Sequence, residues 1–174
     1  MQNPADFLYL EALQILEMEE KKIEINYREY SSVDELSAED RNLVEEAVAA
    51  MGGSYAPYSH FNVGAAVRLS NGVVVRGANQ ENAAFPSGLC AERTAMFAAG
   101  ASYPDKDMLS IAIAGGVLGR LGEKPATPCG ACRQVMAQYQ AKSGRPMSVL
   151  MVSASRIWKF DRVDDILPLI FDCI

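Results

Sequence analysis

The chain of 174 residues is 49% hydrophobic and 22% charged, and its formal net charge is −6 at pH 7. These values are typical of a globular domain with a real core, and the negative charge disfavours binding to the phosphate backbone of nucleic acid. The longest mostly apolar run, residues 108–118, is far shorter than the ~20 residues of a membrane-spanning helix. The N-terminal residues lack the early basic residues of a secretory signal, which favours a cytoplasmic protein.

The first part of the chain predicts an N-terminal extension. The apolar residues of segment 1–20 have a spacing that fits neither a clean helix nor a strand, so this segment is interpreted as a helical appendage or as partly disordered. Residues 23–28 alternate between apolar and polar types, which predicts a half-buried strand. We assign residues 1–36 to this extension.

A capped helix is expected to follow the extension. Ser37 is the expected N-cap, and the apolar residues after it recur at helical spacing as far as Met51. Gly52 is the expected end of this helix. Residues 61–69 then read as a strand that returns through a tight turn, with the second strand over residues 73–77.

Helices and strands alternate over the rest of the chain. The expected elements are a helix over 90–100 ended by Gly100, a buried strand over 109–114, a loop over 115–127, a helix over 129–141 and a strand over 148–152. This order implies right-handed crossovers and a partly parallel sheet covered by helices. The earlier hairpin is expected to supply an antiparallel edge.

Two short segments carry cysteines with the spacing of metal ligands. Cys129 and Cys132 are three residues apart, so their sulfurs lie on one face in the first turn of a helix. Free N–H groups and the helix dipole at such a position favour thiolates. Cys90 occupies the equivalent start of the preceding helix. Three thiolates can hold Zn²⁺ and leave the fourth position for water, which is the arrangement of a catalytic site.

Glu92 and Arg93 lie two and three residues beyond Cys90 and complete the pattern. Glu92 can reach the open coordination position, where a carboxylate can carry a proton from water to a substrate. Zinc nucleobase deaminases use this combination of cysteines and glutamate. Arg93 is expected to withdraw charge from the sulfurs and so to offset the excess negative charge of three thiolates.

Other readings of the cysteines remain open at this point. A C-x-x-C pair between a strand and a helix is also typical of a thioredoxin-like redox site, but that reading leaves Cys90 and Glu92 without a role. A structural zinc site, or a non-catalytic zinc module used for assembly, would want a fourth protein ligand. The remaining cysteine, Cys173, is interpreted as a free thiol.

Four ordered segments resemble the short cytidine deaminases, namely residues 55–66, 79–83, 90–95 and 127–134. The likeness covers about residues 37–153, with a weaker echo at 166–171. It implies that the chain has an α/β fold with three α/β/α layers and a mixed five-stranded sheet. Residues 37–174 are assigned to the catalytic domain. The implied activity is zinc-dependent deamination of cytidine and deoxycytidine to uridine and deoxyuridine, with release of ammonia, as in pyrimidine salvage.

The resemblance also implies roles for individual residues. Zinc would be bound by the three helix-start cysteines, and Glu92 would shuttle protons to the pyrimidine N3 and the leaving amine. The base would be held by the backbone N–H of Ala91, the carbonyl of Thr127 and the ring of Phe61. The ribose 3′-hydroxyl would be bound by Asn79 and Glu81.

Short cytidine deaminases are homotetramers in which neighbouring subunits complete each site, and Phe85 and Phe171 match aromatic positions used in that way. A related enzyme that deaminates blasticidin shares the zinc motifs but lacks the Asn-x-Glu-Asn pattern found at residues 79–82. A deaminase of polynucleotides would be expected to show a basic groove with interleaved aromatic residues. A small nucleoside is therefore the expected substrate, and the sequence leaves the choice between ribose and 2′-deoxyribose open.

Overall fold

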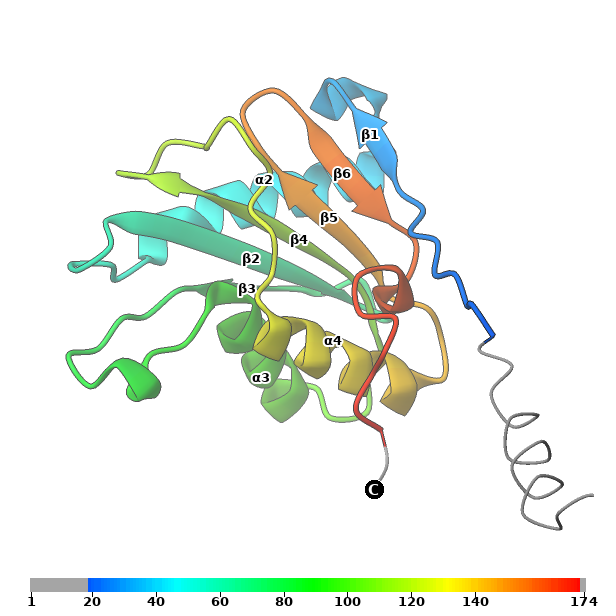
Figure 1. Cartoon of the computed structure of the whole chain (residues 1–174). Helices are drawn as coiled ribbons and strands as arrows, with labels where there is room; N and C mark the ends of the chain where they lie inside the picture. Colours follow the sequence, from blue (N-terminus) through cyan, green and yellow to red (C-terminus); the bar gives the residue numbers. More distant parts are fainter. Residues whose placement is uncertain (1–18, 173–174) are drawn as a thin grey trace, which may run out of the picture.

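A mixed sheet forms the middle layer of the structure, a computed structural model that describes residues 19–172 (Figure 1). Its six strands are β1 (Arg28–Tyr30), β2 (Phe61–Leu69), β3 (Val74–Ala78), β4 (Met108–Val117), β5 (Ser148–Val152) and β6 (Ile157–Phe160). Their order across the sheet is β1-β6-β5-β4-β2-β3. β4 and β5 pair in parallel, whereas the other neighbouring strands are antiparallel. The expected partly parallel sheet with a hairpin at its edge is confirmed.

Helices cover both faces of this sheet. α2 (Ala38–Ala50) lies on one face, and α3 (Ala91–Ser102) and α4 (Gly130–Ser143) lie side by side on the other (Figure 1). Alternate residues of one strand supply the two cores. In β2, Ala65 and Val67 pack with α3 and α4, whereas Ala66 packs with α2. The three-layer α/β/α prediction is confirmed.

The predicted start of α2 is also confirmed. The hydroxyl of Ser37 accepts a hydrogen bond from the Asp40 N–H at 3.2 Å, which satisfies one of the free donors of the first turn. Leu43, Val44 and Ala47 are buried against the sheet as their spacing predicts. No helix of residues 19–172 combines the length and the apolar character that crossing a membrane requires.

The predicted number of strands, five, is wrong because the sheet has six. β6 was missed because its four residues do not alternate between buried and exposed. Ile157 and Phe160 are both buried, while Trp158 and Lys159 between them are partly buried. Residues 153–156 turn the chain back, and the N–H of Ser153 donates to the carbonyl of Arg156 at 3.0 Å.

The strand expected over residues 23–28 is displaced toward the C-terminus. Pairing with β6 is confined to β1, and Ile23 and Ile25 are 54% and 57% exposed. β6 is too short to offer a partner to the whole segment, so the alternating pattern has no sheet face to cover. Tyr27 nevertheless packs on Phe160, with ring centroids 5.2 Å apart. The interpretation of segment 1–20 falls almost entirely on residues 1–18, outside the described residues.

Two predicted element ends are wrong. Gly100 does not end α3, which continues to Ser102. A Cβ added at Gly100 would lie 2.3 Å from Tyr139 Oη, so this glycine permits close packing of α3 against α4. The loop predicted from residue 115 begins later, because β4 runs to Val117 with Gly115 and Gly116 paired to β2.

Gly64 marks the closest approach of α2 to the sheet, and its replacement tests this packing. A Cβ at Gly64 would lie 2.1 Å from the Ala47 carbonyl oxygen and 2.5 Å from the Met51 nitrogen. Gly64→Ala is expected to lower the free energy of unfolding by ~1–3 kcal/mol or more, because backbone atoms must move apart.

Urea denaturation measures this change, and Gly52→Ala is the matched control. A Cβ at Gly52 meets nothing within 4 Å, so this variant should keep its stability or gain up to about 1 kcal/mol. Equal losses in the two variants would contradict the packing argument.

Candidate metal centre

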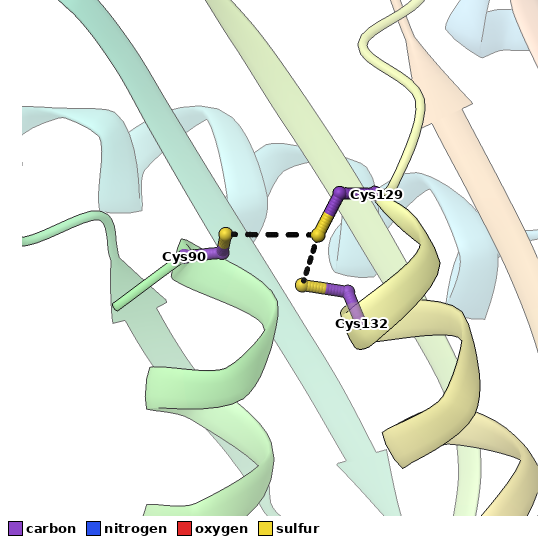
Figure 2. Close-up of side chains that lie close together, drawn as sticks. All are labelled: Cys90, Cys129 and Cys132. Carbon is purple, nitrogen blue, oxygen red and sulfur yellow. Dashed lines mark hydrogen bonds between the residues drawn. The ribbon is translucent and has the colours of Figure 1, made fainter. Parts of the chain in front are cut away.

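Cys90 and Cys129 are the N-cap residues of α3 and α4, and Cys132 lies in the first turn of α4. Neither N-cap side chain bonds to the backbone of its own helix, so both thiols are available for other contacts. Figure 2 shows the three sulfurs pointing toward one another across the gap between the two helix starts. The sheet brings them together by holding α3 and α4 side by side.

The spacing of the three sulfurs fits zinc. The Cys90 and Cys129 sulfurs are 4.0 Å apart, and those of Cys129 and Cys132 are 3.5 Å apart. A tetrahedral site with Zn–S bonds of about 2.3 Å places its sulfurs about 3.8 Å apart. Within residues 19–172, these three side chains form the one group of metal-binding type, and no fourth His, Cys, Asp or Glu belongs to it. That composition is the one expected of an open site and differs from a closed structural site. Cys173 lies outside the described residues.

The charges around Cys90 favour its thiolate. Its pKa is lowered to about 5, first by a hydrogen bond from Cys132 and then by one from Arg93. The Arg93 Nη2 atom lies 3.8 Å from the Cys90 sulfur. The pKa of Cys132 is raised, first by its interaction with Cys90 and then by burial. Arg93 therefore lies where the sequence predicted, against a sulfur, and the buried Arg93 Nε has no hydrogen-bond partner among the described residues.

Glu92 is buried beside the cysteines. It lies in the first turn of α3 and is 4% exposed. Burial raises the pKa of its carboxyl group, and the negative charge of Cys90 raises it further. A carboxyl group whose pKa moves toward neutrality can both accept and donate a proton near pH 7.

A cavity of about 570 Å³ opens in front of the cysteines. Residues that the sequence singled out line much of it, namely Phe61, Asn79, Cys90, Ala91, Glu92, Thr127 and Cys129. The remaining wall is largely apolar and includes Val63, Ile113 and Pro125. A largely apolar cavity with a few polar groups is suited to a small, partly polar molecule.

Glu81 lines a second cavity of about 600 Å³, which shares Asn79 and Cys90 with the first. The Glu81 carboxylate accepts hydrogen bonds from the N–H groups of Tyr58 and Ser59 at 2.9 and 3.2 Å, and from the Ser59 hydroxyl at 2.5 Å. These bonds, that of the Ser59 hydroxyl first, lower the pKa of Glu81. Glu81 is therefore an ionised and firmly oriented acceptor.

Asn79 is held by bonds within the chain. Its Oδ1 accepts from the Val63 N–H at 2.8 Å and the Ser54 hydroxyl at 2.5 Å, and its Nδ2 donates to the Phe61 carbonyl at 2.9 Å. Asn79 thus fixes the end of β2 that presents Phe61. Ser54 and Ser59 were not predicted as site residues. Their only signal in the sequence is that a hydroxyl side chain stands on each side of the loop before β2.

The two aromatic residues expected to complete the sites of neighbouring subunits lie outside the first cavity. Phe85 is 76% exposed and lines the second cavity. Its ring and that of Tyr58 form a T-shaped pair with centroids 5.9 Å apart. Phe171 is 67% exposed and lines neither cavity. Its backbone is held on α4 by the side-chain amide of Gln134.

The cysteine cluster lies in a stretch of the chain that matches a known sequence family. Residues 37–144 match the model of the cytidine and deoxycytidylate deaminase zinc-binding region. The chain belongs to this family. The match contains the three clustered cysteines, so the metal that fits their sulfurs is zinc.

Named relatives and solved structures agree with this membership. A cytidine deaminase of Halalkalibacterium halodurans is 48% identical over 55% of this chain and 68% of its own, and one of Sporosarcina psychrophila is 39% identical over 62% and 69%. The crystal structure of cytidine deaminase from Burkholderia pseudomallei matches with a TM-score of 0.64 at 38% identity, covering 75% of this chain and 97% of that chain. The Mycobacterium tuberculosis enzyme matches with a TM-score of 0.62 at 32% identity, covering 78% and 99%.

Removal of single cysteines tests the ligand assignment. Cys90→Ala, Cys129→Ala and Cys132→Ala should each lose zinc, because two thiolates leave two positions of the tetrahedron without protein ligands. Metal analysis of the purified variants measures the occupancy. Cys173→Ala is the control and should keep its zinc. Full occupancy in Cys90→Ala would contradict the assignment.

Proposed function

We propose that this protein is a zinc-dependent deaminase that hydrolyses cytidine and deoxycytidine to uridine and deoxyuridine, releasing ammonia for a role in pyrimidine salvage. The observation that carries the proposal is the buried Glu92 beside three clustered cysteines, in a cavity that Cys90, Glu92 and Cys129 line. Zinc held by Cys90, Cys129 and Cys132 supplies the Lewis acidity that makes a water molecule nucleophilic near neutral pH.

The residues around the cavity orient the base. Phe61, 39% exposed at the start of β2, offers its ring face for stacking. Ala91 is the first residue of α3, so its N–H has no acceptor within the helix and is free to donate to the pyrimidine O2. The carbonyl of Thr127 accepts from the 4-amino group. These contacts direct C4 of the base toward the cysteines.

Glu92 moves the protons. It takes a proton from the attacking water and passes it to N3 of the base as the C4–O bond forms. It then takes the proton of the new C4 hydroxyl and delivers it to the amine as the C4–N bond breaks and the C4=O bond forms, so water and cytidine become uridine and ammonia. A raised pKa suits both steps, because the group must be a base at first and an acid later.

The second cavity is proposed to bind the sugar. Glu81 is an ionised acceptor with a fixed orientation, which suits a bond from the ribose 3′-hydroxyl. The Asn79 amide lies between the two cavities and already holds Phe61, so we propose that it links base stacking to sugar binding. A carboxylate in this position disfavours a polynucleotide, whose 3′-oxygen carries a phosphate.

The quaternary structure, location and domain limits belong to the same proposal. The exposure of Phe85 and Phe171 supports a homotetramer in which neighbouring subunits add aromatic rings to each site. We propose that the enzyme acts in the cytoplasm, and its acidic composition supports this location. We also propose that residues 37–174 form the catalytic domain, with residues 1–36 as an extension whose β1 continues the sheet.

Glu92→Gln tests the catalytic role. The variant keeps the shape of the side chain but cannot carry protons, so kcat/KM for cytidine should fall by at least ~10²–10⁴-fold. The ultraviolet absorbance change of cytidine measures the rate, and metal analysis should show unchanged zinc. Activity within a few-fold of the wild type would refute the role and favour a non-catalytic module.

Glu81→Gln tests sugar recognition. Sites built to bond a hydroxyl reject analogues that lack it by up to ~10⁴–10⁵-fold. The wild type should therefore use 3′-deoxycytidine and cytosine poorly. Glu81→Gln should lose much of its kcat/KM for cytidine but far less for 3′-deoxycytidine, in which the bond is already missing.

The four kcat/KM values, analysed as a double-mutant cycle, isolate this interaction. Equal losses on the two nucleosides would mean that Glu81 supports the loop over residues 55–60 and does not read the sugar. A wild-type enzyme that deaminates cytosine as fast as cytidine would remove the nucleoside assignment.

A further inference from the structure

One side chain connects residues 127–129, which we call the metal-binding loop, to the C-terminal segment. Arg133 follows Cys132 on α4, and its Nε donates to the carbonyl of Pro128 at 2.9 Å. Its Nη1 donates to the carbonyl of Ile166 at 2.8 Å. Pro128 directly precedes Cys129, whereas Ile166 belongs to residues 163–172, which we call the tail segment and which runs beside α4 (Figure 1).

The first of these bonds acts on the position of a proposed zinc ligand. The carbonyl of Pro128 lies in the same peptide plane as the Cα of Cys129, so a donor that fixes this oxygen also fixes where the Cys129 side chain begins. Pro128 is buried, and a buried carbonyl that loses its partner is costly. The planar guanidinium supplies two donors at a fixed separation, which a lysine ammonium cannot reproduce.

The tail segment is tied to α4 at two further points. The Gln140 Oε1 accepts from the Val163 N–H at 3.0 Å. The Gln134 amide accepts from the Phe171 N–H at 3.3 Å and donates to the Phe171 carbonyl at 2.8 Å. Within residues 19–172, Arg133 alone among these three side chains also bonds to the metal-binding loop. Displacement of that loop is therefore transmitted to the tail through Arg133.

We propose that Arg133 is a positioning residue that couples the zinc ligand Cys129 to the tail segment. Bound zinc steadies the tail, and the attached tail in turn strengthens zinc binding, because the coupling free energy between two sites is reciprocal. Weaker binding is expected to show chiefly as faster release of zinc. The tail carries the exposed Phe171, so the coupling links metal occupancy to the placement of that ring. This inference rests on the proposed function, since it requires Cys129 to bind zinc.

The test uses the full chain and the variant Arg133→Lys, which keeps the charge but replaces the fork with a single nitrogen. Zinc release to a coloured chelator should be about tenfold faster, the lower range for loss of a bond that orients a metal ligand. Hydrogen–deuterium exchange of residues 163–172 should rise when zinc is stripped from the wild type. In Arg133→Lys it should already be high with zinc bound, so that stripping adds little.

Lys142→Met is the matched control. Lys142 also lies on α4 and donates to a proline carbonyl, that of Pro104 at 2.8 Å, but Pro104 is remote in sequence from the cysteines. This variant should keep wild-type zinc release and tail exchange. Gln134→Ala is the second comparison; it should raise exchange around Phe171 while zinc release stays near the wild-type rate, because the bond to Pro128 remains.

Three results would overturn the inference. These are zinc release from Arg133→Lys within about twofold of the wild type, tail exchange in the wild type that does not respond to zinc, and Gln134→Ala releasing zinc as fast as Arg133→Lys. The wild-type exchange comparison needs no variant, so misfolding of Arg133→Lys cannot hide the answer. A wild type that binds no zinc at all would instead refute the proposed function, and metal analysis before the exchange experiment separates that case.

Discussion

The close approach of three cysteine sulfurs is the constraint on which the rest of the structure depends. Two thiolates about 4 Å apart repel by about 4 kcal/mol at an effective dielectric constant of ~20. Three ionised thiolates therefore cannot share this place without a compensating cation. The protein supplies part of the compensation through Arg93 and through two helix N-termini directed at the sulfurs. Zinc supplies the remainder, which makes metal binding part of the stability of this end of the molecule.

Two helices can bring their starts together only if both are packed closely on one sheet. Glycines on the strands permit this approach. A Cβ at Gly77 of β3 would lie 2.3 Å from the Ala95 nitrogen in α3, so the helix backbone rests directly on the strand. At Gly116 of β4, a Cβ would lie 1.8 Å from the Arg120 carbonyl oxygen. That glycine lets the chain fold back and lead toward Thr127 and the pair formed by Cys129 and Cys132.

The second pattern in the site is that polar side chains are oriented before any substrate arrives. Glu81 is held by two N–H groups and a hydroxyl, and Asn79 bonds to both sides of the β2 start. Such preorganisation lowers the ordering cost of binding. Glu92 differs, since it is buried and its pKa is raised, which suits the proton transfer proposed for it. Burial raises the pKa of Glu92, whereas hydrogen bonds lower that of Glu81, so the surroundings push these two carboxylates in opposite directions.

The sequence by itself determined the chemistry of this protein. The C-x-x-C spacing, the third cysteine at a second helix start and the glutamate two residues beyond it are local patterns, readable because a helix start places such residues on one face. The ends of β2 and β5 and the cap of α2 were readable for the same reason, since alternation and capping act over a few residues. Only the tertiary structure decided the rest. β6 has no periodic signal and exists because β5 and β1 pair with it. Gly100 resembled a helix end but serves a contact with Tyr139, and the bridge from Pro128 through Arg133 to Ile166 joins residues far apart in the chain. Contacts of this kind depend on how the layers pack, and no local pattern encodes them.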